Sequence, residues 1–87
     1  MQIKTVAIQA GNEHTLSDHV RSCVEDYFAH LNGHDSTNLY QLVLNEVEKP
    51  LLETALKHAD FNQSKAAKVL GLSRSTLRKK LEQYGIS

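Results

Sequence analysis

The feature that most constrains the fold is a 26-residue run, residues 62–87, with the sequence NQSKAAKVLGLSRSTLRKKLEQYGIS. Two short apolar segments in this run each follow an N-cap residue and end at a glycine: Asn62 and Gly71 for the first, Ser73 and Gly85 for the second. These signals predict helices over about residues 63–70 and 74–84, separated by a turn of roughly three residues. Two short helices joined in this way form the helix-turn-helix.

The spacing of particular residue types makes this motif specific. The positions that follow its familiar spacing are Gln63, Ala67, Gly71 and Leu77. Ala67 has to be small because the second helix crosses close to it, and Gly71 supplies the turn that reverses the chain. We expect the small core between the helices to be filled by Leu70, Leu72, Leu77 and Leu81. The alternative is an ordinary helical hairpin with a basic face.

The formal net charge of zero hides an asymmetry along the chain. Residues 1–60 carry four basic and nine acidic side chains, a net −5, whereas residues 61–87 carry six basic and one acidic, a net +5. The basic end is the part of the chain that would attract a polyanion. A basic run is also common on a solvated helix face, so charge alone does not decide between the two interpretations.

The way in which helix-turn-helix motifs bind double-stranded DNA predicts which side chains contact bases and which contact phosphates. The second helix enters the major groove and its first residues reach base edges, so we expect Arg74 to recognise guanine through the O6/N7 pair. Arg78, Lys79 and Lys80 are consecutive, fan across roughly 200°, and are expected to bind phosphates. The start of the first helix also suits a phosphate. The predicted DNA-contacting residues are Asn62, Ser64, Lys65, Ser73, Arg74, Ser75, Thr76, Arg78, Lys79 and Lys80.

A helix is predicted before the motif, over about residues 16–31. Thr15 is a good N-cap, and Asp18 occupies the capping-box position three residues later. One apolar stripe runs along this helix: Leu16, Val20, Cys23, Val24, Tyr27, Phe28 and Leu31. Gly33 is the expected left-handed C-cap. Because Cys23 lies on the stripe, we interpret it as a small core residue.

A longer helix is predicted over about residues 38–58, with Pro50 in its middle. The apolar period continues in phase across the proline, so we expect a kink; a break into two helices at residues 48–49 is the alternative. The apolar surface is wider than one stripe, which indicates burial on more than one side. Two copies of the chain would form a four-helix core, whereas an up-down monomer would leave Tyr40 or Leu44 in water.

The remaining features exclude several other classes. Residues 1–15 predict a loose arm in preference to a weak hairpin, because two short strands alone are marginal in water. No apolar run approaches the roughly 20 residues of a membrane span, and the first residues do not form a signal peptide. The single cysteine cannot form an intramolecular disulfide, which fits a reducing cytoplasm. A phosphate loop, a nucleophile elbow and a metal-ligand cluster are all absent from the sequence, so we expect no enzyme activity, cofactor or metal.

Three stretches resemble the Fis family, bacterial nucleoid-associated factors for inversion stimulation: residues 27–33, 39–52 and 76–85. The similarity extends over about residues 16–87. It implies an all-α fold with four helices per chain: a flexible arm over residues 1–15, dimerisation helices within 16–60 that intertwine in a homodimer core, and a helix-turn-helix over 61–87. It further implies DNA bending with indirect readout of the minor groove, loose sequence preference, and action in chromosome compaction and transcription regulation in the nucleoid. RNA polymerase or a recombinase is a possible further partner.

The chain also departs from the family pattern. Ser73 stands where well-studied members have asparagine, and Glu82 and Gln83 stand where they have lysine. The family's N-terminal arm, which contacts a DNA invertase, is not recognisable here, which argues against recombinase stimulation. Two alternatives are the DNA-binding domain of an NtrC-type activator and a protein-interaction or dimerisation module that does not bind DNA.

Overall fold

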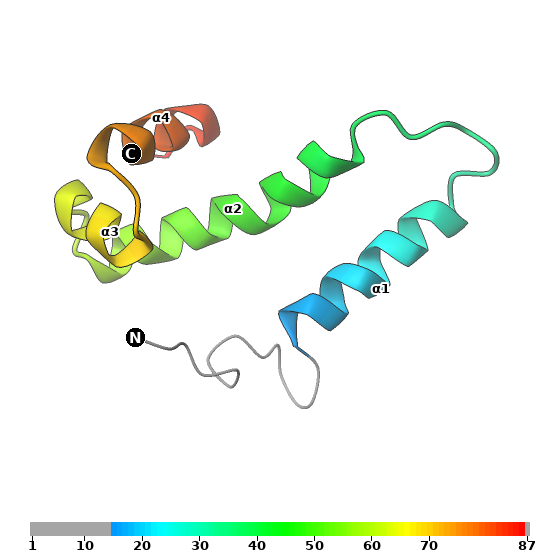
Figure 1. Cartoon of the computed structure of the whole chain (residues 1–87), viewed down its shortest axis with the longest axis horizontal. Coiled ribbons are helices and arrows are strands. Elements are labelled where there is room, and N and C mark those ends of the chain that lie inside the picture. Colours follow the sequence, from blue (N-terminus) through cyan, green and yellow to red (C-terminus); the bar gives the residue numbers. More distant parts are fainter. Residues whose placement is uncertain (1–14, 87) are drawn as a thin grey trace. The chain divides into compact units, whose positions relative to one another are not determined.

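The computed structural model describes residues 15–86, so the arm expected over the first residues lies almost entirely outside the described residues. Four helices make up the described part, which confirms the all-α fold class (Figure 1). They are α1 (Leu16–Ala29), α2 (Leu39–His58), α3 (Gln63–Leu70) and α4 (Arg74–Tyr84). The chain divides into two compact units, residues 1–39 and 40–87, which are described separately below.

The first unit contains α1, and local hydrogen bonds fix where this helix begins. The Thr15 side chain accepts a hydrogen bond from the Asp18 amide at 3.2 Å, and the Thr15 amide donates to Asp18 Oδ2 at 3.2 Å. The predicted capping box is therefore confirmed. The Asp18 carboxylate also binds the Arg21 guanidinium at 3.0 Å.

The end of α1 differs from the prediction. The helix stops at Ala29 with His30 as its C-cap, and Gly33 lies three residues beyond the cap. Asn32 already adopts a left-handed conformation, with φ 53°, before Gly33 adopts one with φ 82°. Gly33 is left-handed as predicted, but the prediction that it is the C-cap was wrong, because the helix has already ended at Ala29 and is capped by His30.

The apolar stripe of α1 is not buried within a single chain. The helix has no buried residue, and Phe28 is 54% exposed although its ring packs edge-on against that of Tyr27 at 5.8 Å. Cys23 is exposed, which corrects its interpretation as a core residue. The helical periodicity of the stripe was predicted correctly, and Val20, Val24, Tyr27 and Leu31 on it are half-buried.

The second unit is built around α2, which is one continuous helix of 20 residues with Pro50 inside it. The alternative of two helices separated at residues 48–49 is therefore wrong. Only the C-terminal half of α2 contributes buried residues, Leu52 and Leu56. Tyr40, in the first turn, is 79% exposed, and Leu42 and Leu51 are also exposed, so part of the wide apolar surface expected to be buried is not buried in a single chain.

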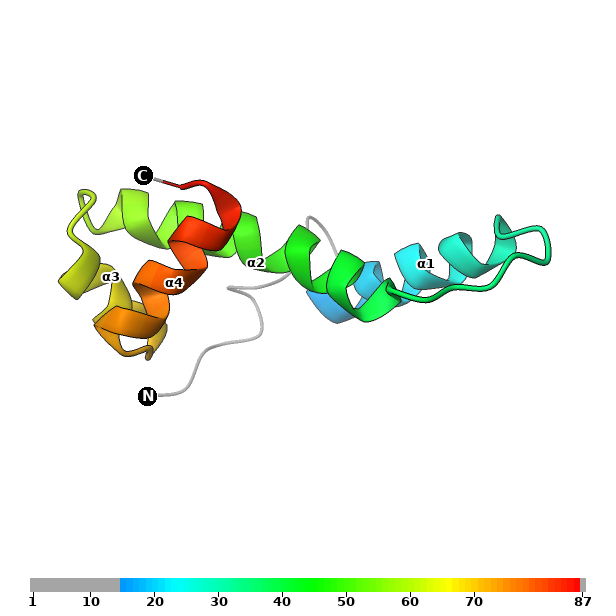
Figure 2. The same cartoon turned by 90° about the horizontal axis from the view of Figure 1, so that it is seen from above.

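The core of the second unit joins α2, α3 and α4. Its buried residues are Leu52, Leu56, Ala59, Ala66, Ala67, Leu77 and Leu81, and three further side chains pack against them: Leu70, Tyr84 and Ile86. Both views show α3 at the C-terminal end of α2 and α4 beside α2 (Figures 1 and 2). Small Ala67 is buried as expected, but Leu72 is only half-buried and does not belong to this cluster. Leu72 lies in the turn, where its amide donates to the Ala67 carbonyl at 2.9 Å.

Candidate nucleic-acid interface

Two capped helix starts define the candidate interface. The Asn62 Oδ1 accepts a hydrogen bond from the Lys65 amide at 3.1 Å, and the Ser73 Oγ accepts one from the Thr76 amide at 3.1 Å. Both predicted N-caps are therefore present, and each is followed by a helix that ends in a left-handed glycine, Gly71 or Gly85. The caps fix the two residue stretches that were predicted to approach DNA, at the positive ends of the helix dipoles.

Hydroxyl groups cluster at the start of α4. The Ser73 hydroxyl donates to Thr76 Oγ1 at 2.8 Å and lies 3.3 Å from the Ser75 hydroxyl. Ser73 and Ser75 are exposed, and Thr76 is half-buried. The short Ser73 side chain is therefore folded back onto its own helix as a cap, in the position at which the resemblance implies an asparagine.

Arg74 connects the starts of the two helices. Its Nη1 donates to the Ser64 Oγ at 3.3 Å, across ten residues of sequence, and both side chains are exposed. A hydrogen bond between α3 and α4 at this point restricts the rotamers of a long, flexible side chain. The guanidinium that we expect to read a base therefore lies next to a residue that we expect to bind a phosphate.

The buried face of α4 determines which of its other side chains are accessible. Leu77 and Leu81 are buried, and at about 100° per residue Lys79 lies roughly 200° around the helix from Leu77. Arg78 and Lys79 are exposed, as are Asn62 and Lys65 on the α3 side. Nine of the ten predicted contact residues thus carry no ion pair with another described side chain.

Lys80 is the exception among the predicted residues, because it is directed toward α2. Its Nζ donates to Glu48 Oε2 at 2.8 Å, and the exposed side-chain fractions of Lys80 and Glu48 are 30% and 16%. The Tyr84 hydroxyl donates to Glu48 Oε1 at 2.6 Å and lies 3.2 Å from Asn45 Oδ1. We call Glu48, Lys80 and Tyr84 the α2–α4 polar cluster.

The electrostatics of this cluster follow from its hydrogen bonds. The hydrogen bonds from Lys80 and then from Tyr84 stabilise the Glu48 carboxylate and lower its pKa below the ordinary value. The same Glu48 carboxylate raises the pKa of the Tyr84 hydroxyl to about 12, because the phenol proton is held in a hydrogen bond to an anion. Sequence reasoning missed this cluster. The available signal was the spacing of four residues that puts Glu48 on the same face of α2 as Leu52 and Leu56.

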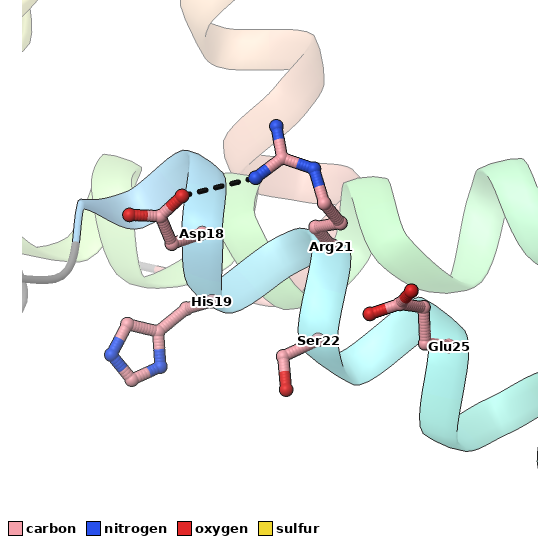
Figure 3. Close-up of a pocket in the computed structure, with 5 residues that line it drawn as sticks. All are labelled: Asp18, His19, Arg21, Ser22 and Glu25. Atoms are coloured by element: carbon pink, nitrogen blue, oxygen red, sulfur yellow. Dashed lines mark hydrogen bonds and ion pairs between the residues drawn. The ribbon is translucent and has the colours of Figure 1, made fainter.

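A surface hollow lies on α1, away from the basic residues 61–87 in the sequence. Figure 3 shows its five lining side chains along one helix, with the Asp18–Arg21 ion pair at one end. Within residues 15–86, no group of three or more His, Cys, Asp or Glu side chains is placed to hold a metal ion. No helix in that same range is long and apolar enough to cross a membrane.

Two short helices packed across a glycine turn, with capped starts and a basic second helix, define the helix-turn-helix class. Two family models match the chain. One, "Bacterial regulatory protein, Fis family", matches residues 43–84, and the other, "DNA-binding protein Fis N-terminal domain", matches residues 1–36. The chain belongs to the Fis family of DNA-binding proteins.

Individual relatives agree with this assignment. A putative Fis-like DNA-binding protein of Pseudomonas aeruginosa is 54% identical over 72 residues, covering 83% of this chain and 69% of the relative. DNA-binding protein Fis of Pectobacterium carotovorum is 44% identical over 88 residues, covering 100% of this chain and 90% of the relative. DNA-binding protein Fis of Psychromonas ingrahamii is 54% identical over 71 residues, covering 82% and 72%.

The comparisons correct one expectation about the first residues. The expectation that the family's N-terminal arm is not recognisable was wrong, because the N-terminal family model matches residues 1–36 and the Pectobacterium alignment covers the whole chain. The sequence of residues 1–15 contains few helix signals, so it offers little by which a family could be identified. Similarity therefore extends beyond residues 16–87.

Proposed function

We propose that this protein binds double-stranded DNA as a symmetric homodimer, bends it, and acts as a transcriptional regulator in the bacterial nucleoid. The observation that carries the proposal is the contact between Arg74 and Ser64, which joins the exposed starts of α3 and α4 into one basic surface. The net +5 charge of residues 61–87 gives that surface attraction for a phosphate backbone.

The homodimer is supported by apolar surface that a single chain leaves open. No residue of α1 is buried, and Phe28, Tyr40, Leu42 and Leu51 are exposed. An amphipathic helix whose apolar stripe contains no buried residue is expected to bury that stripe against a partner. A second copy, supplying the same faces, would give a four-helix core.

The roles of the contact residues follow from their positions. In the proposal, Arg74 reads guanine from the start of the recognition helix α4, while Ser73, Ser75 and Thr76 contribute nearby hydrogen bonds. Phosphates are bound by the exposed polar and basic side chains Asn62, Ser64, Lys65, Arg78 and Lys79.

The Arg74→Ala variant tests the base-reading role. Loss of a bidentate guanine contact should cost roughly 1–3 kcal/mol of binding free energy and relax the preference at one symmetric pair of base positions. Arg21→Ala is the matched control, since Arg21 lies on α1 and pairs with Asp18. Quantitative gel retardation on a set of single-base operator variants measures both effects. A loss that is equal on every sequence would make Arg74 a phosphate contact.

The Lys79→Ala variant tests the phosphate-binding role. Binding should weaken on every sequence, and the slope of log K against log salt should become shallower by about 0.9. Lys49→Ala on α2 is the control, because it removes one positive charge at an exposed site outside the proposed interface. An unchanged slope for Lys79→Ala would remove this residue from the interface.

Bending and stoichiometry are tested together by gel retardation with circularly permuted DNA fragments. The proposal expects mobility that depends on the position of the site, and two chains per site. A protein-interaction module would give no salt-sensitive retardation at all. The match of residues 1–36 to the N-terminal Fis model favours a whole Fis protein over the DNA-binding domain of an NtrC-type activator.

That same match supports an accessory role in site-specific recombination. The resemblance to the Fis family implies that the N-terminal arm contacts the recombinase. An inversion assay with the full chain and with a variant lacking residues 1–14 separates this role from DNA binding. The role is rejected if the full chain binds its sites and yet gives no stimulation. RNA polymerase is the other protein partner that transcription regulation would require.

A further inference from the structure

Glu48 stands out because it is an acidic side chain turned toward the basic recognition helix. Its two carboxylate oxygens are both occupied, Oε2 by Lys80 at 2.8 Å and Oε1 by Tyr84 at 2.6 Å. It lies four residues before Leu52 on α2, so its side chain leaves the helix on the face that packs against α4. The contact is therefore part of the packing between the two helices.

Lys80 and Tyr84 form the matching surface on α4. They are four residues apart and lie about 60° and 20° around the helix from buried Leu77, on the flank of the core that meets α2. Arg74 lies about 60° to the other side, on the flank from which it reaches Ser64 of α3. The recognition helix is thus held along both flanks, by a hydrogen bond to α3 and by the α2–α4 polar cluster.

The surroundings of the Glu48–Lys80 pair make it hard for a phosphate to compete for Lys80. Only 16% of the Glu48 side chain and 30% of the Lys80 side chain are exposed, so salt screens this pair less than a surface pair. Moving the Lys80 ammonium to a DNA phosphate would leave a carboxylate in a mostly covered site without its counter-charge, which is unfavourable.

We propose that Glu48 is a positioning residue of the DNA-binding surface: it retains Lys80 against α2 and holds α4 in the rotation that turns Ser75 and Lys79 outward. Lys80 then does not count among the phosphate contacts, although it belongs to the run Arg78-Lys79-Lys80. This inference rests on the proposed DNA binding, and it limits the number of DNA charges that the recognition helix neutralises.

The test compares salt slopes of DNA binding for the wild-type homodimer and three variants, Lys80→Ala, Glu48→Gln and the double variant. Lys80→Ala should leave the slope unchanged, in contrast to Lys79→Ala. Glu48→Gln keeps the size of the side chain and an acceptor for the Tyr84 hydroxyl, but it releases Lys80. The slope should then steepen by about 0.9, which is a further loss of roughly threefold in affinity between 50 and 200 mM salt.

The double variant separates release of Lys80 from a general charge effect. Its slope should return to the wild-type value, because the released lysine is no longer present. Three results would each overturn the inference: a slope about 0.9 shallower for Lys80→Ala, a wild-type slope for Glu48→Gln, or a steep slope that persists in the double variant. Far-UV circular dichroism verifies that each variant is folded, and if Glu48→Gln is not, the Lys80→Ala slope alone decides.

A readout without DNA keeps this inference distinct from the proposed function. The ¹⁵N resonance of the Lys80 ammonium should be protected from fast exchange in the free wild-type protein and should be lost in Glu48→Gln. It should also persist when DNA is added. If no protein in the series binds DNA, the proposed function fails, and an unprotected Lys80 ammonium in the free protein would by itself refute the contact with Glu48.

Discussion

Replacement of Leu77 by alanine tests whether the three-helix core is what holds the recognition helix in place. Leu77 is 0% exposed and lies in contact with a core formed from α2, α3 and α4. The substitution removes three buried carbon atoms, which at about 0.8 kcal/mol per buried CH₂ gives roughly 2.4 kcal/mol of lost transfer free energy. The cavity that remains adds to this, and comparable Leu→Ala changes cost about 2.7–5.0 kcal/mol.

The local structure favours the lower part of that range. Leu70, Tyr84 and Ile86 pack against the core and are only partly buried, so the core around Leu77 is small and not fully enclosed. We therefore expect a loss of about 3 kcal/mol in the free energy of unfolding per chain. A chain of 87 residues has a free energy of unfolding of about 4–13 kcal/mol, so the variant should fold but lose a large part of that stability.

The assay is urea denaturation followed by far-UV circular dichroism, at one fixed protein concentration because a dimer's stability depends on concentration. Val69→Ala is the matched control: Val69 is 63% exposed, so its truncation should cost no more than about 0.5 kcal/mol. The reasoning fails if Leu77→Ala unfolds within 0.5 kcal/mol of the wild type at an unchanged m-value, or if Val69→Ala costs as much.

Two further predictions concern titration and capping. The Tyr84 hydroxyl should ionise near pH 12 in a spectrophotometric titration, and because this folded-state pKa lies above the ordinary 10.0, the associated stability is present below pH 10 and is lost as the pH rises toward 12. Tyr84→Phe should remove that high-pH step, and its persistence would contradict the contact with Glu48. Thr15→Ala should destabilise α1 by about 1 kcal/mol, visible as lost helicity. The hydrogen bonds from Thr15 lower the pKa of Asp18 below 3.8. The stability that the ionised Asp18 gives to α1 is therefore present above pH 3.8 and is lost in acid. If Asp18→Asn loses helicity in acid as much as the wild type does, this contribution of Asp18 is refuted.

The helix limits were predictable because they depend on neighbours in the sequence. Asn62 and Ser73 satisfy amides three residues ahead, and Gly71 and Gly85 adopt the left-handed conformation that ends each helix. The same local reasoning failed at the end of α1, because Gly33 is left-handed as predicted but the helix has already ended at Ala29. A glycine with a left-handed conformation therefore does not by itself fix the residue at which a helix ends.

Burial was predictable only where the covering element belongs to the same chain. Leu77 and Leu81 are buried in the core shared with α2 and α3, but the equally regular stripe of α1 has no buried residue and leaves Cys23 exposed. A periodic pattern reports that a face is apolar, and it does not report what covers that face. The stripe therefore predicted the helix correctly, whereas the prediction that Cys23 is a core residue was wrong.

The environment of Lys80 could not be obtained from its own helix. Three consecutive basic residues are equivalent in composition, and only the packing of α4 on α2 distinguishes Lys80, which meets Glu48, from exposed Lys79. The partner lies 32 residues away in the sequence. A contact between residues so far apart in the sequence depends on the tertiary structure, which helix propensities and capping signals do not predict.

The continuity of α2 through Pro50 has a geometric consequence. A helix of 20 residues is about 30 Å long, and it connects a first turn in which Tyr40 is exposed with the stretch from Asn45 onward that contacts the recognition helix. Inserting a single residue near Pro50 would shift one half by about 1.5 Å and rotate it by about 100° against the other. Insertion of one full turn would restore the relative rotation of the two parts but lengthen the helix by about 5.4 Å. The length of this helix, and not only its surface, is therefore under constraint.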